Sequence, residues 1–364
     1  MGLLFCIELS HAESSRSLSQ DMNRTSKTRP VEQEPLFRLG TWLRQQGYEF
    51  VTVTPATHAR VIGRNPAREA RTLEDIFGWN LPFRADLLPE EALSLLREAD
   101  AVDDNPGLLR SRIRLSTLGD LLFLHSGYPT SKGDAVFFGP DTYRFATLIE
   151  NILNRFDTSH ISTVADMGCG SGAGGIVARR LLDDAAPQLI LSDLNPLALQ
   201  YSAINAALAG LEPPIMRQGD LYAHVGAPLD LIIANPPYLV DTHGRTYRHG
   251  GGSLGAELSR RIVIEGLPRL AANGLMVLYT ASAIVKGHDT FRETVHEALQ
   301  HPDIEHEYRE IDPDVFGEEL DNPAYAEVER IAAVSLVIQV KHPIDMSAAR
   351  SRTHEREVPA LLSA

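Results

Sequence analysis

The chain has 364 residues, of which 43% are hydrophobic, and its 48 Asp and Glu against 34 Lys and Arg give a formal net charge of −14. This length indicates two domains, because single hydrophobic cores usually stop growing near ~250 residues, and the composition is that of a globular protein. Only two cysteines are present and no apolar run reaches the ~18 residues of a membrane span, which excludes a disulfide framework, a cysteine-based zinc site and a transmembrane segment.

The first part of the chain is predicted to hold a disordered leader, residues 1–30, and a small α+β domain for substrate recognition, residues 31–135. The leader is almost wholly polar from residue 10 onward and offers nothing to bury. The expected elements of the domain are a helix over 36–48 that ends at Gly47, a strand over 50–55, a helix over 88–102, and a hairpin of strands 110–118 and 121–126 around Gly119 and Asp120.

Residues 136–345 alternate strand and helix signals and are predicted to form a second domain, followed by a flexible tail, 346–364. Strands separated by 10 to 15 helical residues are typical of a parallel, doubly wound, Rossmann-like sheet. The last two of seven expected strands, 304–312 and 331–341, have no helix between them and predict an antiparallel pair at the sheet edge. The other strands are expected at 156–168, 186–193, 215–220, 229–237 and 275–282, with helices at 172–184 and 196–210.

Ligands of an open α/β sheet bind beyond the carboxyl ends of its strands, so polar residues at those ends are the candidates for a site. The first end is Asp166-Met167-Gly168-Cys169-Gly170-Ser171-Gly172. Its glycines allow a tight turn and a close approach of backbone to ligand. The spacing is not that of a dinucleotide fingerprint, and no Lys follows as in a P-loop. A plain tight connection would explain the turn by itself equally well.

Two aspartates follow the next strands. Asp193 ends the second strand, where an acidic residue commonly accepts hydrogen bonds from ribose hydroxyls. It could instead cap the helix that begins at Pro196, as could Asn195. Asp220 follows the third strand and could accept a hydrogen bond from an exocyclic amine of adenine, although a simple turn aspartate is the alternative.

The fourth end, Asn235-Pro236-Pro237-Tyr238, is the most constrained. Two consecutive prolines prevent the backbone from continuing as a strand or from entering a helix at once. They therefore fix a polar Asn and an aromatic Tyr at the mouth of the sheet. An ordinary turn does not need this much constraint.

Together the four strand ends resemble the class I S-adenosylmethionine-dependent methyltransferases, whose signature is DxGCGSG, an acidic end of strand two, a later Asp and NPPY. The resemblance covers residues 136–341. The NPPY form is similar to enzymes that methylate a planar nitrogen, namely protein-glutamine N5-methyltransferases acting on release factors and adenine or guanine N-methyltransferases of DNA and RNA. The segment Gly139-Pro140-Asp141-Thr142 is also similar to a Pro-Glu-Thr segment of the glutamine enzymes, and equally to a helix start capped by Asp.

The resemblance implies roles for individual residues. Asp193 would hold the ribose, Gly168 to Gly172 would pass beside the methionine moiety, and Asp220 with Leu221 would flank the adenine. The residues thus assigned to S-adenosylmethionine are Asp166, Gly168, Cys169, Gly170, Gly172, Asp193, Leu194, Asp220, Leu221 and Asn235.

The resemblance also implies a catalytic set. The side-chain oxygen of Asn235 and the carbonyl of Pro236 would accept hydrogen bonds from the target NH2, while Tyr238 stacks on its planar face. The residues expected to meet the substrate are Pro237, Tyr238, Asp141, Gly251 and Gly252, the glycines because they belong to a flexible stretch after NPPY that could equally be a surface loop. The acidic run 312–320 is either a substrate-contacting insertion or a solvated loop.

Three functions remain open on these observations. The first is an N-methyltransferase for a protein glutamine. The second is a nucleic-acid base N-methyltransferase, favoured by Arg110, Arg112 and Arg114, which would share one strand face that could meet phosphates, although a solvated face is the alternative. The third is a non-catalytic cofactor-binding partner. The thirteen histidines show no paired metal spacing, so no metal is expected, and the protein is expected to be cytoplasmic with a protein or nucleic-acid partner and no membrane.

Overall fold

The computed structural model describes residues 31–105, 107–130, 132–240, 248–252 and 254–344. The predicted leader, 1–30, and the predicted tail, 346–364, lie outside these residues. Within the described part of the chain, no helix combines the length and the apolar character needed to cross a bilayer.

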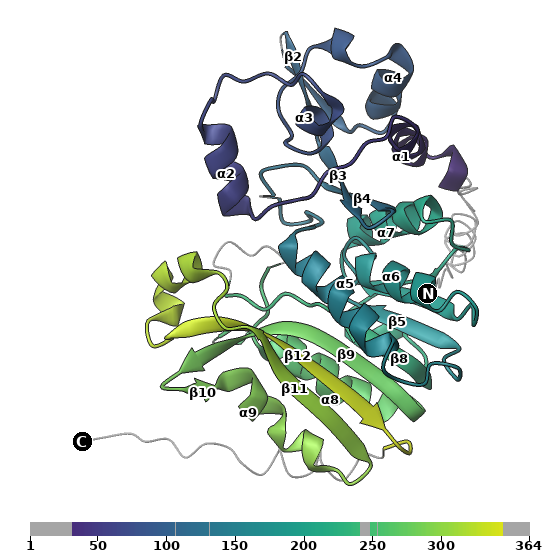
Figure 1. Ribbon diagram of the computed structural model, residues 1–364, viewed down its shortest axis with the longest axis vertical. Helices are drawn as coiled ribbons and strands as arrows, with labels where there is room; N and C mark the ends of the chain where they lie inside the picture. The colour runs from purple at the N-terminus through teal and green to yellow at the C-terminus, as the bar shows by residue number, and fades with distance from the viewer. Residues whose placement is uncertain (1–30, 106, 131, 241–247, 253, 345–364) are drawn as a thin grey trace, which may run out of the picture.

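One large sheet dominates the second half of the chain, and it confirms the predicted Rossmann-like α/β class (Figure 1). Its main path runs β11-β12-β9-β8-β5-β6-β7, with the short β10 paired to β9. The strands β7, β6, β5, β8 and β9 are parallel, whereas β12 is antiparallel to both β9 and β11, which confirms the predicted edge pair. The strands are β5 (Thr163–Met167), β6 (Gln188–Asp193), β7 (Ile215–Gln218), β8 (Leu229–Ala234), β9 (Leu270–Val285), β10 (His288–Asp289), β11 (Ile304–Asp312) and β12 (Arg330–Val340).

Helices cover both faces of the sheet, which explains why its central strands are apolar runs. In β8, Leu231 and Ile233 belong to the core shared with α5 and α6. The alternate residues Ile232 and Ala234 belong to the core shared with α8 and α9. The helices are α5 (Pro140–Leu153), α6 (Ala173–Leu181), α7 (Pro196–Leu208), α8 (Glu257–Gly266) and α9 (Thr290–His296).

The first hundred described residues form helices and two separate hairpins. The hairpin predicted around Gly119 is confirmed, since β3 and β4 pair antiparallel on either side of it. The elements are α1 (Pro35–Gln45), α2 (Pro55–Gly63), α3 (Leu73–Phe77), α4 (Glu90–Glu98), β1 (Val102–Asn105), β2 (Leu108–Ser111), β3 (Ile113–Leu118) and β4 (Leu121–Ser126).

The strand predicted over residues 50–55 is wrong. The stretch joins no ladder, and α2 begins at Pro55. The carbonyl of Phe50 accepts from Thr117 N at 2.8 Å, while Phe50 N donates to the Thr117 hydroxyl at 3.3 Å. Thr52 N donates to the Tyr143 hydroxyl at 3.1 Å. Because side chains take part of this backbone hydrogen bonding, the β-branched sequence does not produce a paired strand.

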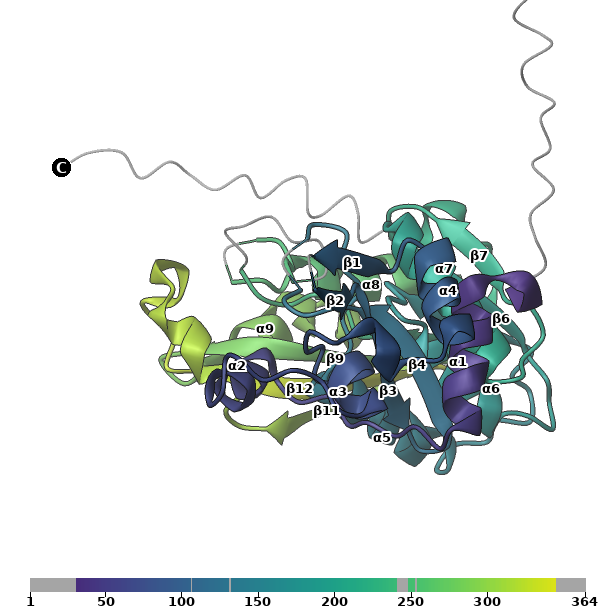
Figure 2. The ribbon, with the colours of Figure 1, turned by 90° about the horizontal axis from the view of Figure 1, so that it is seen from above.

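The N-terminal elements pack on the sheet domain through α7, which lies beside α1 and β4 (Figure 2). Asn205 of α7 is 1% exposed and acts as a pairing partner for β4. It accepts from Leu124 N at 2.7 Å and donates to Leu124 O at 3.0 Å. Its amide also donates to Ser171 O in the glycine-rich turn at 2.9 Å. One side chain therefore joins the N-terminal hairpin to the predicted cofactor loop.

Candidate functional site

The glycine-rich turn after β5 combines left-handed backbone with close packing. Gly168 and Gly170 have φ of 69° and 54°, a region that L side chains rarely adopt. A Cβ at either position would meet nothing within 4 Å, so the turn leaves open space beside its backbone. At Gly172 a Cβ would lie 2.8 Å from Cβ of Ser202 on α7. The first two glycines therefore keep room for a ligand, and the third lets the turn pack on α7.

Asp193, at the end of β6, holds this turn in place. Its Oδ2 accepts from Gly170 N at 2.8 Å, and its Oδ1 accepts from Asn195 N at 2.8 Å. The cap of α7 is Asn195, which accepts from Leu197 N at 2.9 Å, so Asp193 is not the helix cap. Burial raises the pKa of Asp193, and the backbone N–H groups oppose that shift. Each carboxylate oxygen keeps acceptor capacity for a ligand hydroxyl.

Asp166, in β5, is a buried acid at the floor of the same turn. It is 2% exposed, and its Oδ2 accepts from Gly175 N, in the first turn of α6, at 2.7 Å. Burial raises the pKa of this carboxyl to about 7, and the neighbouring Asp193 carboxylate also raises it. The Asp166 carboxyl therefore gains or loses its proton near neutral pH, and a charged group that enters the site shifts its pKa.

Asp220, after β7, is committed to an ion pair. Its Oδ1 and Oδ2 accept from Nη1 and Nη2 of Arg261 on α8 at 3.2 and 3.0 Å. The next residue, Leu221, begins the 3-10 helix η4 (Leu221–His224) at φ 48°. Both residues line the cavity described below. The sequence carried no sign of the ion pair between Asp220 and Arg261.

These strand ends surround one cavity of about 630 Å³, a size common for small-molecule sites. The predicted residues that line it are Asp166, Gly168, Cys169, Gly170, Asp193, Leu194, Asp220, Leu221, Asn235 and Pro237. Gly172 and Pro236 are not in its wall. The lining also includes the segment 133–137, Asn195, His249 and Leu258, which were not among the predicted site residues. Asn195 was already considered as a candidate helix cap. The other lining residues do not follow a strand of the sheet, so no such pattern in the sequence marks them.

Tyr238 lies beside the cavity rather than in its wall. Its ring is 6.4 Å from that of Tyr279 and 5.9 Å from that of Phe316. Tyr279 of β9 donates to Oδ1 of Asp141 at 2.8 Å, and Arg144 donates to the same oxygen at 3.1 Å. Burial, and then the charge of Asp141, raise the pKa of the Tyr238 hydroxyl. The structure thus brings Asp141 and Tyr238 together, and Asp141 does not cap α5.

The glycines after NPPY differ in how closely they are packed: Gly250 lies against backbone atoms, whereas Gly251 and Gly252 have more space. Gly250 N donates to Leu239 O at 2.9 Å, and a Cβ there would lie 1.9 Å from Gly255 O and 2.7 Å from Pro237 O. Gly251 and Gly252 are near the start of α8, where a Cβ on either would lie 3.4 Å from Cβ of Glu257. The structure does not place these two in the cavity wall. Residues 241–247 and 253 lie outside the described part.

The stretch between β11 and β12 packs against the residues that follow NPPY. It contains the 3-10 helices η7 (Gly317–Asp321) and η8 (Pro323–Tyr325). The Tyr325 hydroxyl accepts from Val240 N at 2.8 Å, and Asn322 donates to Val240 O at 3.3 Å. The acidic Glu319 pairs with Arg248. This stretch therefore supports the NPPY segment.

The arginine face considered for nucleic acid is not available as predicted. Strand β2 ends at Ser111 and β3 begins at Ile113, so the three arginines do not share one continuous strand. Arg114 is buried and donates to Gly78 O at 2.8 Å. Arg112 pairs with Asp100 and Asp103, and Arg110 donates to a backbone carbonyl. Packing thus buries Arg114, whereas Arg112 is exposed and Arg110 is half-buried.

No group of three or more His, Cys, Asp or Glu side chains within the described ranges is placed to hold a metal ion. Residues 144–297 match the family named Methyltransferase small domain. This segment includes all four strand ends that line the cavity.

Three curated relatives each align with part of the chain. A release factor glutamine methyltransferase of Xylella fastidiosa is 39% identical over 97 residues, 26% of this chain and 34% of that protein. The enzyme of the same name from Deinococcus radiodurans is 30% identical over 159 residues, 41% and 55% of the two chains. A ribosomal protein uL3 glutamine methyltransferase of Bordetella pertussis is 34% identical over 134 residues, 34% and 44%. The chain thus spans between a third and somewhat more than half of the length of these relatives.

Proposed function

We propose that this chain, which carries a methyltransferase small domain over residues 144–297, is an S-adenosylmethionine-dependent N-methyltransferase that modifies a glutamine side chain of a protein. The observation that supports this most is the single cavity in which Asp166, Gly170, Asp193 and Asn235 meet. These residues come from three neighbouring parallel strands of one sheet edge. That edge is the ligand-binding edge of an open α/β sheet.

The residues present fit the cofactor. Asp193 keeps acceptor capacity for the two ribose hydroxyls, and Gly168 and Gly170 leave free space along the backbone for an extended chain. Leu221 offers an apolar flank for an adenine ring. Asp166 and Asp193 place two acidic groups where a cation is favoured. S-adenosylmethionine, when bound, supplies a methyl group on a positively charged sulfur.

The acceptor nitrogen would be positioned by the NPPY segment. The Asn235 side-chain oxygen and the Pro236 carbonyl would accept hydrogen bonds from the two N–H bonds of a planar NH2. Tyr238, fixed between Tyr279 and Phe316, would limit the tilt of that group. In the transfer, the nitrogen–carbon bond forms as the carbon–sulfur bond breaks, the sulfur keeps the bonding electrons, and one amide proton leaves to water. Orientation of this kind can contribute ~7–11 kcal/mol to catalysis.

A protein glutamine is favoured over a nucleic-acid base by two observations. The named relatives include glutamine methyltransferases of a release factor and of a ribosomal protein. Of the arginines that would have met phosphates, Arg114 is buried, and Arg112 is exposed but pairs with Asp100 and Asp103. One relative, a ribosomal RNA small subunit methyltransferase C of Sodalis glossinidius, is 37% identical over 87 residues, 24% of each chain, so the test must separate the two acceptors.

The catalytic claim is tested with Asn235→Ala. We expect methyl transfer from labelled cofactor to the macromolecules of a lysate without its own copy of the gene to fall by roughly a hundredfold, as when a single transition-state contact is removed. The affinity for S-adenosylmethionine, measured by calorimetry, should change far less. Asn151→Ala, an exposed position on α5, is the matched control. Unchanged transfer by Asn235→Ala, or no transfer by the wild type, would contradict an enzymatic role for this site.

A further inference from the structure

Asp141, in the first turn of α5, is a buried acid outside the wall of the larger pocket. It is 6% exposed, and its helix neighbours Thr142 and Phe145 line the pocket while Asp141 does not. The Thr142 hydroxyl accepts from Gly139 N at 3.3 Å at the helix start, and the Asp141 carboxylate is not used as a cap. An influence of Asp141 on the pocket must therefore pass through a neighbouring side chain.

Three donors converge on the Asp141 carboxylate. Its Oδ1 accepts from the Tyr279 hydroxyl at 2.8 Å and from Arg144 Nη1 at 3.1 Å. The carboxylate also accepts from the Tyr238 hydroxyl. An ionised carboxylate has no proton to give, so each phenol is the donor, and the Arg144 guanidinium balances the negative charge. Of the three partners, only Tyr238 belongs to the NPPY segment.

The Tyr238 ring is enclosed by aromatic neighbours and anchored at its hydroxyl. Its centroid lies 6.4 Å from that of Tyr279 and 5.9 Å from that of Phe316. Aromatic contacts at such distances permit several ring orientations, whereas a hydrogen bond is directional. The side chain as a whole is half-buried, so part of it remains accessible. The contact with Asp141 therefore selects one orientation of the ring.

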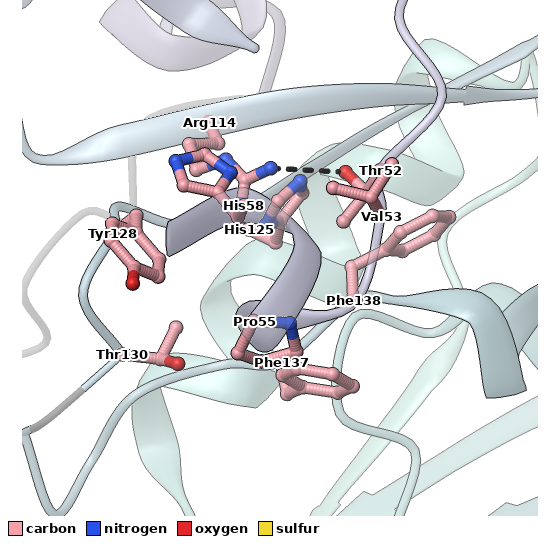
Figure 3. Close-up of a pocket in the computed structure, with 10 residues that line it drawn as sticks. All are labelled: Thr52, Val53, Pro55, His58, Arg114, His125, Tyr128, Thr130, Phe137 and Phe138. Carbon is pink, nitrogen blue, oxygen red and sulfur yellow. Dashed lines mark hydrogen bonds between the residues drawn. The ribbon is translucent and has the colours of Figure 1, made fainter. Parts of the chain in front are cut away.

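The start of α5, which carries Asp141, is fixed by the N-terminal elements. The Phe138 ring stacks on His125 of β4, with centroids 5.3 Å apart. The Tyr143 hydroxyl accepts from Thr52 N at 3.1 Å. Figure 3 shows Phe138, His125 and Thr52 around the small cavity that these elements enclose. Asp141, between Phe138 and Tyr143 in the chain, is thus held in place from both sides.

Arg144 extends these contacts to the stretch between β11 and β12. Its Nη2 donates to Asp312, at the end of β11, at 3.3 Å, while its Nη1 donates to Asp141. The same stretch supplies Phe316, whose ring packs on Tyr238. The N-terminal elements and the β11–β12 stretch therefore both reach Tyr238, the first through Asp141 and the second through Arg144 and Phe316.

We propose that Asp141 is a positioning residue for methyl transfer, because its carboxylate holds the Tyr238 hydroxyl and thereby sets the plane of the ring beside the acceptor nitrogen. This role rests on the proposed function, since it needs an acceptor group next to NPPY. A planar amide lies flat on an aromatic ring only when the ring has the matching plane. Loss of the hydrogen bond keeps the ring but permits other tilts, so the nitrogen is aimed less well at the methyl carbon. The rate of transfer should therefore respond, and the affinity for the cofactor should not.

The first test examines the contact without catalysis. The full chain is labelled with meta-fluorotyrosine, and the fluorine NMR signal of Tyr238 is identified by its absence in Tyr238→Phe. Asp141→Asn should shift this signal at pH 7, because the carboxylate that the labelled phenol contacts is gone. Glu150→Gln, the same change at an exposed position of α5, should leave the signal in place. An unshifted signal in Asp141→Asn would overturn the contact.

The second test is a double-mutant cycle on methyl transfer from labelled cofactor to the macromolecules of the lysate. Asp141→Asn and Tyr238→Phe should each lower the rate at saturating S-adenosylmethionine by about tenfold or more, with the KM for the cofactor changed by less than about twofold. The double variant should be no slower than the slower single variant, because both changes remove the same hydrogen bond. Glu150→Gln should keep the wild-type rate.

Losses that multiply in the double variant, or full activity of either single variant, would overturn the positioning role. A raised KM for the cofactor at an unchanged maximal rate would also overturn it, since Asp141 would then support the cofactor site. If Asp141→Asn does not fold, Tyr238→Phe still decides, because it keeps the ring and its packing. Absent transfer by the wild type would contradict the proposed function, and the fluorine signal would still decide whether Asp141 holds Tyr238.

Discussion

Replacing Asp166 by Asn should make the protein more stable at neutral pH and remove part of its pH dependence. The pKa of the folded Asp166 carboxyl, about 7, is higher than that of an unfolded aspartate. At a pH between these two pKa values, the folded state therefore holds a proton that the unfolded state has lost. Stability is therefore lost as pH rises through this window. The whole shift corresponds to roughly 4 kcal/mol. Asparagine retains an oxygen to accept from Gly175 N and carries no charge to bury.

The assay is urea unfolding of the wild type and Asp166→Asn between pH 5 and 8. The free energy of unfolding of the variant relative to the wild type should rise by roughly 2–3 kcal/mol across this range. Asp86→Asn, an exposed position, should give a curve parallel to the wild type. Parallel curves for Asp166→Asn would refute the reasoning. Because a bound cation favours the ionised acid, the affinity of the wild type for S-adenosylmethionine should also increase from pH 5 to pH 8.

Three further substitutions test separate parts of the structure. Asn205→Ala should lower the free energy of unfolding, measured in urea, by about 2–5 kcal/mol, because it leaves the buried N–H and C=O of Leu124 without partners. A change below about 0.5 kcal/mol would argue against a stabilising role of Asn205 between α7 and β4. Asp193→Asn should weaken cofactor binding by roughly 10–100-fold in calorimetry through loss of charged hydrogen bonds, and an unchanged affinity would remove Asp193 from the site. Gly250→Ala should abolish methyl transfer while cofactor binding persists, because its Cβ would collide with backbone oxygens of Gly255 and Pro237; full activity would show that this contact is dispensable.

The strand ends could be predicted because their geometry is general. Parallel strands of one sheet bring their carboxyl ends to the same edge, so Asp166, Asp193, Asp220 and Asn235 had to converge once their strands were recognised. The apolar runs of the strands and the prolines after β8 made that recognition possible. The roles of these residues toward cofactor and acceptor remain predictions.

Residues outside the strand ends could not be predicted in the same way. Phe137 and Leu258 line the larger pocket through the packing of distant segments, and no local pattern marks such contacts. The bidentate partner of Asp220, Arg261, comes from a helix 41 residues along the chain. The prediction for Arg114 was wrong for a different reason. The alternation of side chains along a strand places Arg114 on one face, but the sequence does not show that this face is buried.

The central claim is the transfer of a methyl group to a protein glutamine, and one experiment addresses it most directly. The purified chain is incubated with methyl-labelled S-adenosylmethionine and a lysate without its own copy of the gene, and the product is divided between protease and nuclease digestion followed by mass spectrometry. We expect label in N5-methylglutamine from the protease digest. Label released by nuclease, or no labelled macromolecule while the cofactor still binds, would contradict the account.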